Sequence, residues 1–286
     1  MPAIEPTPVM HPGGWRVEAT PDFEAVAGPD WLAAIMTWPV TDRFHAKQNR
    51  NIGRLRLTGG GRTVVVYLKR HFERRAGGFG GRSPAFVEYL HLQRARAHGL
   101  PVPRAPAVGE RTLPDGRRES FLAVEELAGM LALHELVPLA AARLDPATFH
   151  AWKRGLAREV GRLIARLHAG RLYHRDLYLC HFYAREGDID SPPADWAGRV
   201  AVIDFHRLVH PRLPNAWLRV KDLAQLLFSG DSVVGLAGRD ALRSFASYRR
   251  SWPAGGRRYL LPLIQWKAGR YRRHNARPAA AQEGIG

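Results

Sequence analysis

The sequence predicts an α+β fold with two lobes, a β-rich lobe followed by a helical one. Three observations predict it. Apolar β-branched residues alternate with polar ones before residue 70, apolar residues recur at steps of three and four after residue 145, and Ala128-Gly129 separates these regions. The length of 286 residues fits two lobes, and a hydrophobic content of 45% suffices for a buried core.

The β-rich lobe is expected over residues 31–128, after a loose arm of Pro, Gly and acidic residues at 1–30. Residues 52–57 and 63–69 have strand-like patterns and are separated by glycines, so they predict an antiparallel hairpin. Residues 84–98 carry aromatic and apolar side chains at helical spacing, which predicts a helix. A flexible glycine-rich loop is expected before this helix.

A buried strand at 120–127 is expected to connect this lobe to the helical lobe, which is predicted over residues 129–256. Asp145 followed by Pro146 is a typical N-cap and first-turn pair. The helix that they begin is predicted to end before Gly170, because the apolar periodicity stops there.

The remainder of the chain is predicted to hold a short strand, two helices and a basic tail. Residues 200–205 are apolar and strand-like, and residues 221–229 and 240–250 have helical periodicity. In the C-terminal segment at 257–286, the seven Arg and Lys residues between Arg257 and Arg277 are interleaved with three aromatic residues, Tyr259, Trp266 and Tyr271. This segment is expected either to meet anionic lipid or to form a solvated helix and tail.

The charge balance points to anionic partners. The chain has 43 basic and 26 acidic side chains, which gives a net charge of +17. Such a surface attracts nucleic acid, anionic lipid or phosphorylated sugars, although an arginine-biased composition would give the same total. The single cysteine, Cys180, excludes an internal disulfide and a Cys-rich zinc module.

Three segments carry the most specific chemical signal. His-Arg-Asp at 174–176 follows the long predicted helix, Asp204 ends a short apolar strand, and Lys69 ends a hairpin strand with Glu88 on the next helix. Phosphoryl transfer from ATP needs a lysine for the phosphates, a carboxylate that holds this lysine, an aspartate that takes the acceptor proton, and an aspartate for magnesium. Each residue is a weak signal alone, but their order along the chain is that of kinases.

Five segments together resemble the lipopolysaccharide kinase (Kdo/WaaP) family, and within it the inner-core heptose kinases. They are VYLKRH at 66–71, VEYLHLQRARAHGLPVP at 87–103, HRDLYLCHF at 174–182, VIDFHR at 202–207 and KDLAQLLFS at 221–229. The resemblance extends from about residue 45 to 250. It implies a protein-kinase-like two-lobed fold and phosphorylation of a heptose hydroxyl in the lipopolysaccharide core, with ATP and Mg²⁺.

The resemblance also implies roles for individual residues. Asp176 is expected to be the catalytic aspartate, with His174 and Arg175 beside it in the catalytic loop. Lys69, paired with Glu88, is expected to hold the α- and β-phosphates of ATP.

For the metal, the resemblance implies Asp204 as the magnesium ligand. His181 stands where protein kinases place a metal-binding asparagine, and its imidazole is expected either to assist the metal or to orient phosphate or substrate. His206 replaces the glycine of the usual Asp-Phe-Gly, and Asp222 resembles the buried aspartate that anchors the catalytic loop.

Four more residues are assigned to the nucleotide site: Lys47, Arg50, Glu125 and Leu127. Lys47 and Arg50 lie where the loop that covers the nucleotide is expected, although this region has no glycine-rich signature.

Other functions stay open at this stage. A protein kinase or an antibiotic phosphotransferase would use the same fold, but Tyr178 stands where serine/threonine kinases usually carry a lysine. An Arg-rich nucleic-acid-binding module would explain the charge and leave Lys69, Asp176 and Asp204 unexplained. A pseudokinase is disfavoured because these three positions are all present.

The expected location is the cytoplasm, because neither a signal peptide nor an apolar stretch of about 18 residues is visible. The expected partner is the anionic glycolipid of the lipopolysaccharide core. Peripheral contact with the inner face of the cytoplasmic membrane is a further expectation, and no nucleic acid is expected.

Overall fold

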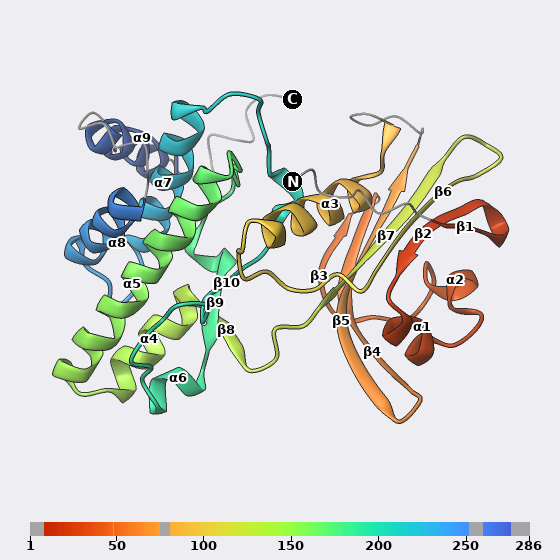
Figure 1. The fold of residues 1–286 in the computed structure, drawn as a ribbon, viewed down its shortest axis with the longest axis horizontal. Helices are drawn as coiled ribbons and strands as arrows, with labels where there is room; N and C mark the ends of the chain where they lie inside the picture. The colour runs from red at the N-terminus through yellow and green to blue at the C-terminus, as the bar shows by residue number, and fades with distance from the viewer. Residues whose placement is uncertain (1–8, 48, 75–80, 252–259, 276–286) are drawn as a thin grey trace. The chain divides into compact units, whose positions relative to one another are not determined.

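The computed structural model describes residues 9–47, 49–74, 81–251 and 260–275. It divides into two compact units (Figure 1). The β-rich unit comprises residues up to Ala97 together with Val102–Ala128. The helical unit comprises His98–Pro101 and the chain from Gly129.

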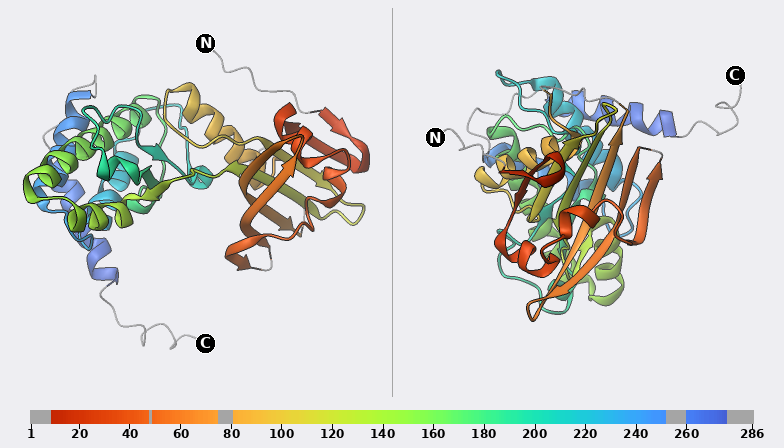
Figure 2. Two further views of the ribbon diagram at one scale, coloured as in Figure 1. Left: turned by 90° about the horizontal axis from the view of Figure 1, so that it is seen from below. Right: turned by 90° about the vertical axis from the view of Figure 1, so that its right-hand side faces the viewer.

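An antiparallel sheet forms the β-rich unit, with the strand order β1-β2-β6-β7-β5-β4-β3 (Figure 2). The strands are β1 (Val9–His11), β2 (Trp15–Ala19), β3 (Thr41–Lys47), β4 (Arg50–Gly59), β5 (Arg62–Glu73), β6 (Ala107–Thr112) and β7 (Arg118–Glu125). The helices of this unit are α1 (Pro21–Ala27), α2 (Trp31–Ala34) and α3 (Pro84–Ala97), with a 3₁₀ turn, η1, at Pro12–Gly14.

The predicted hairpin is present as β4 and β5, and it is longer than expected. Gly60 and Gly61 both have positive φ values and form the turn between the strands. Apolar side chains on one face of these strands, such as Val66 and Leu68, join the core of the unit. The glycine-rich loop expected before α3 lies, apart from Gly81, outside the described residues.

The loose arm predicted at residues 1–30 is wrong for its described part. Residues 15–19 form β2, which pairs with β6, and residues 21–27 form helix α1. Their apolar side chains Trp15 and Phe23 are almost completely buried in the core of the unit. The segment is polar and Pro-rich overall, and its apolar residues are widely spaced, so its composition does not indicate regular structure. Burial of these few apolar side chains in the core stabilises the strand and the helix.

The helical unit has a small sheet with the order β10-β9-β8, formed by β8 (Met130–Ala132), β9 (Phe182–Arg185) and β10 (Ala201–Val202). Its main helices are α4 (Leu133–Arg143), α5 (Pro146–Ala169), α7 (Ala216–Gly230), α8 (Gly238–Ser251) and α9 (Leu260–Asn275). Shorter segments are η3 (Leu179–His181), α6 (Gly187–Asp190) and η4 (Phe205–Arg207). Helix α5 packs against α8, and α7 packs against α9 (Figures 1 and 2).

Helix α5 begins and ends where the sequence signals predict. The Asp145 side chain accepts hydrogen bonds from the backbone N–H groups of Ala147 and Thr148, and the backbone leaves the helix at Gly170. The apolar stripe of this helix is buried, including Trp152, which is 2% exposed. Because α5 is packed in the core, it fixes the position at which the loop that contains residue 174 begins.

One prediction for this unit needs correction. The strand expected at 200–205 is only Ala201–Val202, because Asp204 takes a left-handed conformation with φ 65° and the chain turns into η4. The basic segment at 257–286 holds helix α9, and its other residues lie outside the described part of the chain. Among the described helices, none is both long and apolar enough to span a bilayer.

Candidate active site

In the β-rich unit, Lys69 and Glu88 form a close and largely buried ion pair. Lys69 lies on β5 and Glu88 on α3, and Lys69 Nζ is 2.6 Å from Glu88 Oε1. The Glu88 side chain is 2% exposed and that of Lys69 is 13% exposed. A charged pair with so little solvent is held in one geometry, which suits a lysine that presents its ammonium group to an anion.

The other residues assigned to the nucleotide site lie on neighbouring strands. Arg50 begins β4 and pairs with His71 of β5 and with Lys47 of β3. Directly paired residues share a face, and His71 shares its face with Lys69, which lies two residues earlier on β5. The Arg50 side chain therefore lies on the same face of the sheet as Lys69. The side chain of Lys47 lies outside the described residues.

Glu125 and Leu127 lie at and just beyond the end of β7, and both are half-buried. Glu125 pairs with Val66, so strand alternation directs it to the face opposite to Lys69. The structure therefore does not bring Glu125 together with the Lys69 side chain. Glu126, which the sequence did not single out, lies between these two residues and forms a bidentate ion pair with Arg54 of β4.

In the helical unit, Asp222 of α7 anchors the His174–Asp176 loop. Its side chain is fully buried, and its two carboxylate oxygens accept hydrogen bonds from the backbone N–H groups of His174 and Arg175, each at 2.8 Å. Asp222 Oδ2 also lies 3.3 Å from His168 Nε2. Arg175 has a φ of 67°, a conformation that costs energy for a residue with a side chain, and these bonds stabilise it.

Two polar residues on the same helix extend this anchor. The Gln225 side chain accepts a hydrogen bond from the Leu177 N–H and donates one to the Arg175 carbonyl. The Ser229 hydroxyl accepts a hydrogen bond from the Leu179 N–H. The sequence analysis did not single out Gln225 or Ser229. Polar residues three and seven positions after Asp222 on an otherwise apolar helix were the available signal.

His174 is a positioning residue, because its side chain is completely buried and cannot meet a substrate. Its Nε2 donates to the Ile203 carbonyl at 2.9 Å, and its ring packs against Phe205. Burial lowers the pKa of His174 and favours the neutral imidazole. The imidazole thereby connects the catalytic loop to the segment that carries Asp204.

The Asp176 carboxylate lies among cationic side chains. Arg207 Nη1 is 3.3 Å from Asp176 Oδ1, and 20% of the Asp176 side chain is exposed. Lys221 is a further cation close enough to Asp176 to feel its charge. Burial lowers the pKa of Lys221, and the nearby charges of Arg207 and Arg175 lower it further. Asp176 is thus a partly exposed carboxylate in positive surroundings, which attract phosphate groups. Sequence reasoning missed Arg207, although it ends the VIDFHR segment.

His181 and His206 both contact Asp204. His206 Nδ1 is 2.6 Å from Asp204 Oδ1, and His181 Nε2 is 3.6 Å from Asp204 Oδ2. His181 Nδ1 donates to the Asp176 backbone carbonyl at 2.7 Å, which links the two aspartates through one imidazole. Burial lowers the pKa of His181, but contacts with Cys180, the Asp176 carbonyl and Asp204 raise it more, so the net direction is upward.

The residues around Asp204 fit a magnesium ion that takes few ligands from the protein. In the described part of the chain, no group of three or more His, Cys, Asp or Glu side chains is arranged to hold a metal. Mg²⁺ commonly binds one or two carboxylates and completes its shell with water and phosphate oxygens. The partly exposed Asp204 carboxylate can serve as such a ligand, whereas imidazole is less suited to this hard cation.

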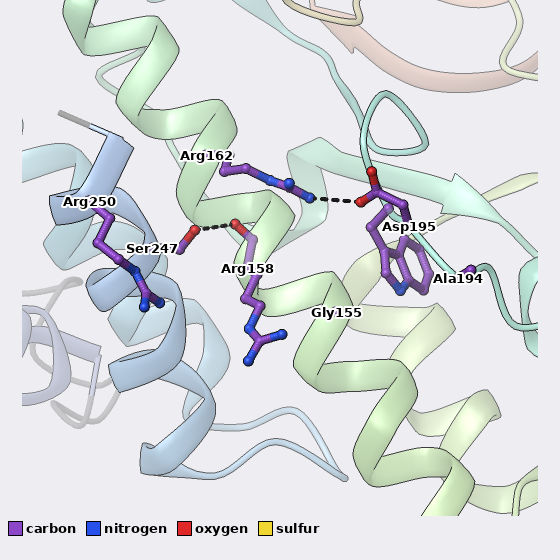
Figure 3. A pocket seen from close by; sticks show the side chains of 8 residues that line it. Gly155, Arg158, Arg162, Ala194, Asp195, Ser247 and Arg250 are labelled. Atoms are coloured by element: carbon purple, nitrogen blue, oxygen red, sulfur yellow. Dashed lines mark hydrogen bonds and ion pairs between the residues drawn. The ribbon is translucent and has the colours of Figure 1, made fainter. Parts of the chain in front are cut away.

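Two cavities of the helical unit are separate from these residues. One, of about 570 Å³, is mainly apolar and lies among α4, α5, α7, α8 and α9, with Leu156, Leu223 and Phe245 in its wall. The other, of about 200 Å³, lies beside α5 and α8 and is lined by Arg158, Arg162 and Arg250 (Figure 3). None of the residues predicted for the active site lines either cavity.

These features define a protein-kinase-like fold, with a strand lysine held by a helix glutamate in the β-rich unit and a His-Arg-Asp loop in the helical unit. Residues 71–248 match the model of the lipopolysaccharide kinase (Kdo/WaaP) family, more than half of the chain. The chain belongs to this family. The resemblance and the fold class predicted from the sequence are confirmed.

Curated relatives agree with this assignment. The chain is 35% identical over 164 residues to lipopolysaccharide core heptose(I) kinase WaaP of Pseudomonas aeruginosa, over 57% of this chain and 58% of the relative. It is 30% identical over 162 residues to the protein of the same name from Escherichia coli, over 56% of this chain and 58% of the relative. The matches thus span 58% of the length of each relative.

A solved structure has a similar fold. It is described as WaaP in complex with acyl carrier protein, and it superposes with a TM-score of 0.68 at 27% sequence identity. The match covers 90% of this chain and 98% of that one.

Proposed function

We propose that this chain is a kinase that transfers the γ-phosphoryl group of ATP to a heptose hydroxyl of the lipopolysaccharide inner core. The observation that carries the proposal is the anchored catalytic loop, in which Asp222 fixes the backbone on the N-terminal side of Asp176. Relatives named core heptose(I) kinases support this class of acceptor.

In the proposed reaction, Asp176 accepts the proton of the heptose hydroxyl while the oxygen attacks the γ-phosphorus. The bond from this phosphorus to the β–γ bridging oxygen breaks, and ADP leaves with its electron pair. Lys69, held by Glu88, binds the α- and β-phosphates, and Arg50 on the same face of the sheet adds positive charge. Positioning and charge neutralisation provide most of the rate enhancement in such reactions.

Mg²⁺, when bound, would neutralise charge on the phosphates of ATP, with Asp204 as its protein ligand. His181 holds the backbone carbonyl of Asp176 and faces Asp204, so its proposed role is to fix the spacing of the two aspartates. Arg175, Arg207 and Lys221 surround Asp176 with positive charge, which favours a phosphate-bearing acceptor.

The test is transfer of labelled phosphate from ATP to purified core glycolipid, followed by mass spectrometry of the heptose region. Asp176→Asn is expected to lower kcat by about 10²- to 10⁴-fold, because the hydroxyl loses its proton acceptor. The matched control is Asp190→Asn, which removes a 70% exposed carboxylate of the same unit and is expected to leave kcat unchanged. Wild-type turnover by Asp176→Asn would refute the proposal.

A second proposed partner is acyl carrier protein. The similar structure contains this partner, and the apolar cavity of about 570 Å³ in the helical unit has the lining that an acyl chain needs. We expect acylated carrier protein to bind better than the form without an acyl group. Ala241→Phe, which fills the cavity, is expected to remove this difference. Equal binding of both forms by the folded wild-type protein would contradict this partner.

The proposed location is the inner face of the cytoplasmic membrane. The acceptor is a glycolipid, so an enzyme that reaches its sugar groups works close to a bilayer surface. Separation of membrane and soluble fractions from cells tests this location, and a chain found only in the soluble fraction would argue against it.

A further inference from the structure

Two tryptophans of the helical unit stand half-exposed beside each other. Trp217 of α7 is 47% exposed and Trp266 of α9 is 49% exposed, and their ring centroids are 6.2 Å apart. Leu263, one helical turn before Trp266, is 43% exposed. Such large apolar side chains are usually buried in folded proteins, so their position together at the surface calls for an explanation.

Cationic side chains lie directly over these two rings. Lys267 Nζ is 5.1 Å from the centroid of the Trp217 ring, and the Arg270 guanidinium is 5.3 Å from the centroid of the Trp266 ring. Both arrangements lie within the range of cation–π interactions. Positive charge and aromatic surface thus occupy the same place, here called the tryptophan surface: Trp217, Leu263, Trp266, Lys267 and Arg270.

Buried residues outside the tryptophan surface also attach α9 to the unit. Leu260, Ile264 and Ala268 lie at steps of four along α9 and are buried, and α9 packs along α7. Helix α9 therefore buries one stripe inside the unit and leaves Leu263 and Trp266 outside it. The exposed side chains are available to a partner.

We propose that the tryptophan surface docks the protein on a bilayer that contains anionic phospholipid. Indole rings favour the boundary between lipid headgroups and acyl chains, and Lys and Arg beside them meet the lipid phosphates. The net charge of +17 adds long-range attraction to the same kind of partner. This inference deepens the proposed location and names the residues responsible, and it does not depend on the sugar that the enzyme phosphorylates.

A bilayer fits this surface better than an acidic protein does. An acidic protein would pair with Lys267 and Arg270, but it would not require two neighbouring indoles and a leucine outside the fold. A membrane interface accommodates both chemistries at once, because its phosphates lie directly above its apolar region.

The test uses the full chain and flotation with vesicles that contain neither ATP nor glycolipid acceptor. Vesicles of phosphatidylglycerol and phosphatidylethanolamine are compared with vesicles of phosphatidylcholine. We expect binding only to the anionic vesicles, decreasing as salt increases. Brominated lipid is expected to quench part of the tryptophan fluorescence of the wild type and much less in Trp217→Ser/Trp266→Ser.

Two variants and one matched control separate aromatic from charge effects. Lys267→Gln/Arg270→Gln is expected to weaken binding about 25-fold, because each cation near an anionic surface contributes about fivefold. Trp217→Ser/Trp266→Ser is expected to weaken it on the order of tenfold or more, because each indole loses apolar contact. Arg249→Gln/Arg250→Gln on α8 removes the same charge from two exposed arginines and should change binding less than threefold, about 0.6 kcal/mol or less.

Several outcomes would overturn the inference. The first is that the wild type does not bind anionic vesicles at low salt. The second is that the α8 control loses as much vesicle binding as Lys267→Gln/Arg270→Gln. The third is that the tryptophan variant binds vesicles normally and loses only its binding to acyl carrier protein. Circular dichroism is used to check that each variant is folded. If the tryptophan variant is not folded, the double variant Lys267→Gln/Arg270→Gln, which changes one half-buried and one exposed side chain, still tests the inference. Vesicle binding without any kinase activity would leave this inference intact and refute only the proposed reaction.

Discussion

Removal of the Asp222 carboxylate is expected to destabilise the helical unit strongly. This side chain is 0% exposed and accepts two backbone hydrogen bonds of 2.8 Å, from His174 and Arg175. A hydrogen bond to a charged group contributes about 1.5–3 kcal/mol, so Asp222→Ala should lower the free energy of unfolding by about 3–6 kcal/mol. Asp222→Asn retains one acceptor oxygen and should lose about half as much.

The assay is urea unfolding at pH 7, followed by circular dichroism. The control is Asp231→Asn at the end of the same helix, which removes a 39% exposed carboxylate from its ion pair with Arg272. An exposed pair contributes at most about 1 kcal/mol, so this variant should stay near the wild type. If Asp222→Ala also stays within about 1 kcal/mol of the wild type, this carboxylate does not hold the loop.

Further predictions concern packing, protonation and the nucleotide site. Gly155→Ala should lower the free energy of unfolding by about 1–3 kcal/mol, because the new Cβ would collide with the buried indole of Trp196. Gly269→Ala should raise it by up to about 1 kcal/mol, because the nearest atom to its new Cβ is 3.6 Å away and alanine favours a helix. Melting temperatures that shift in the same direction in both variants would contradict this. Burial lowers the pKa of His168 below its ordinary value of about 6.5, so the unfolded chain binds the proton first. The free energy of unfolding should therefore fall between pH 7 and 5.5, by up to about 1.4 kcal/mol per pH unit from this group, and His168→Gln should flatten the profile measured by urea unfolding. Glu88→Gln should lower kcat/KM for ATP by about 10- to 100-fold, because Lys69 loses the carboxylate that orients it; unchanged steady-state kinetics would exclude this role.

Elements with local signals could be predicted from the sequence. Helix α5 has an N-cap at Asp145, a stripe of apolar residues and a glycine at its end, all within one continuous segment. The β4–β5 hairpin likewise has its turn glycines between two strand-like patterns. Such signals involve neighbours in the chain, so no knowledge of the tertiary structure is needed to read them.

Elements that depend on distant partners could not be predicted. Strand β2 is stabilised by β6, and nothing in its own composition announces this partner. The same holds within the candidate site. Asp176 and Asp204 were visible as motifs, but the contact of Arg207 with Asp176 joins residues 31 positions apart and follows from the turn at Asp204. A motif identifies the functional side chains, whereas the residues that contact them depend on the tertiary structure.

The pairing of β2 with β6 also has a consequence for synthesis on the ribosome. Arg16 pairs with Glu110, so β2 leaves the ribosome well before β6, the strand that covers its edge. During that time Trp15 and Val17, which are 2% and 1% exposed in the finished unit, lack the part of their core that β6 and β7 supply: Ala107, Phe121 and Ala123. Contacts so distant in sequence slow folding and expose apolar strands to aggregation. Chaperones that bind nascent chains should therefore raise the yield of folded protein. We expect their binding to matter most after β2 has been synthesised and before β7 has been.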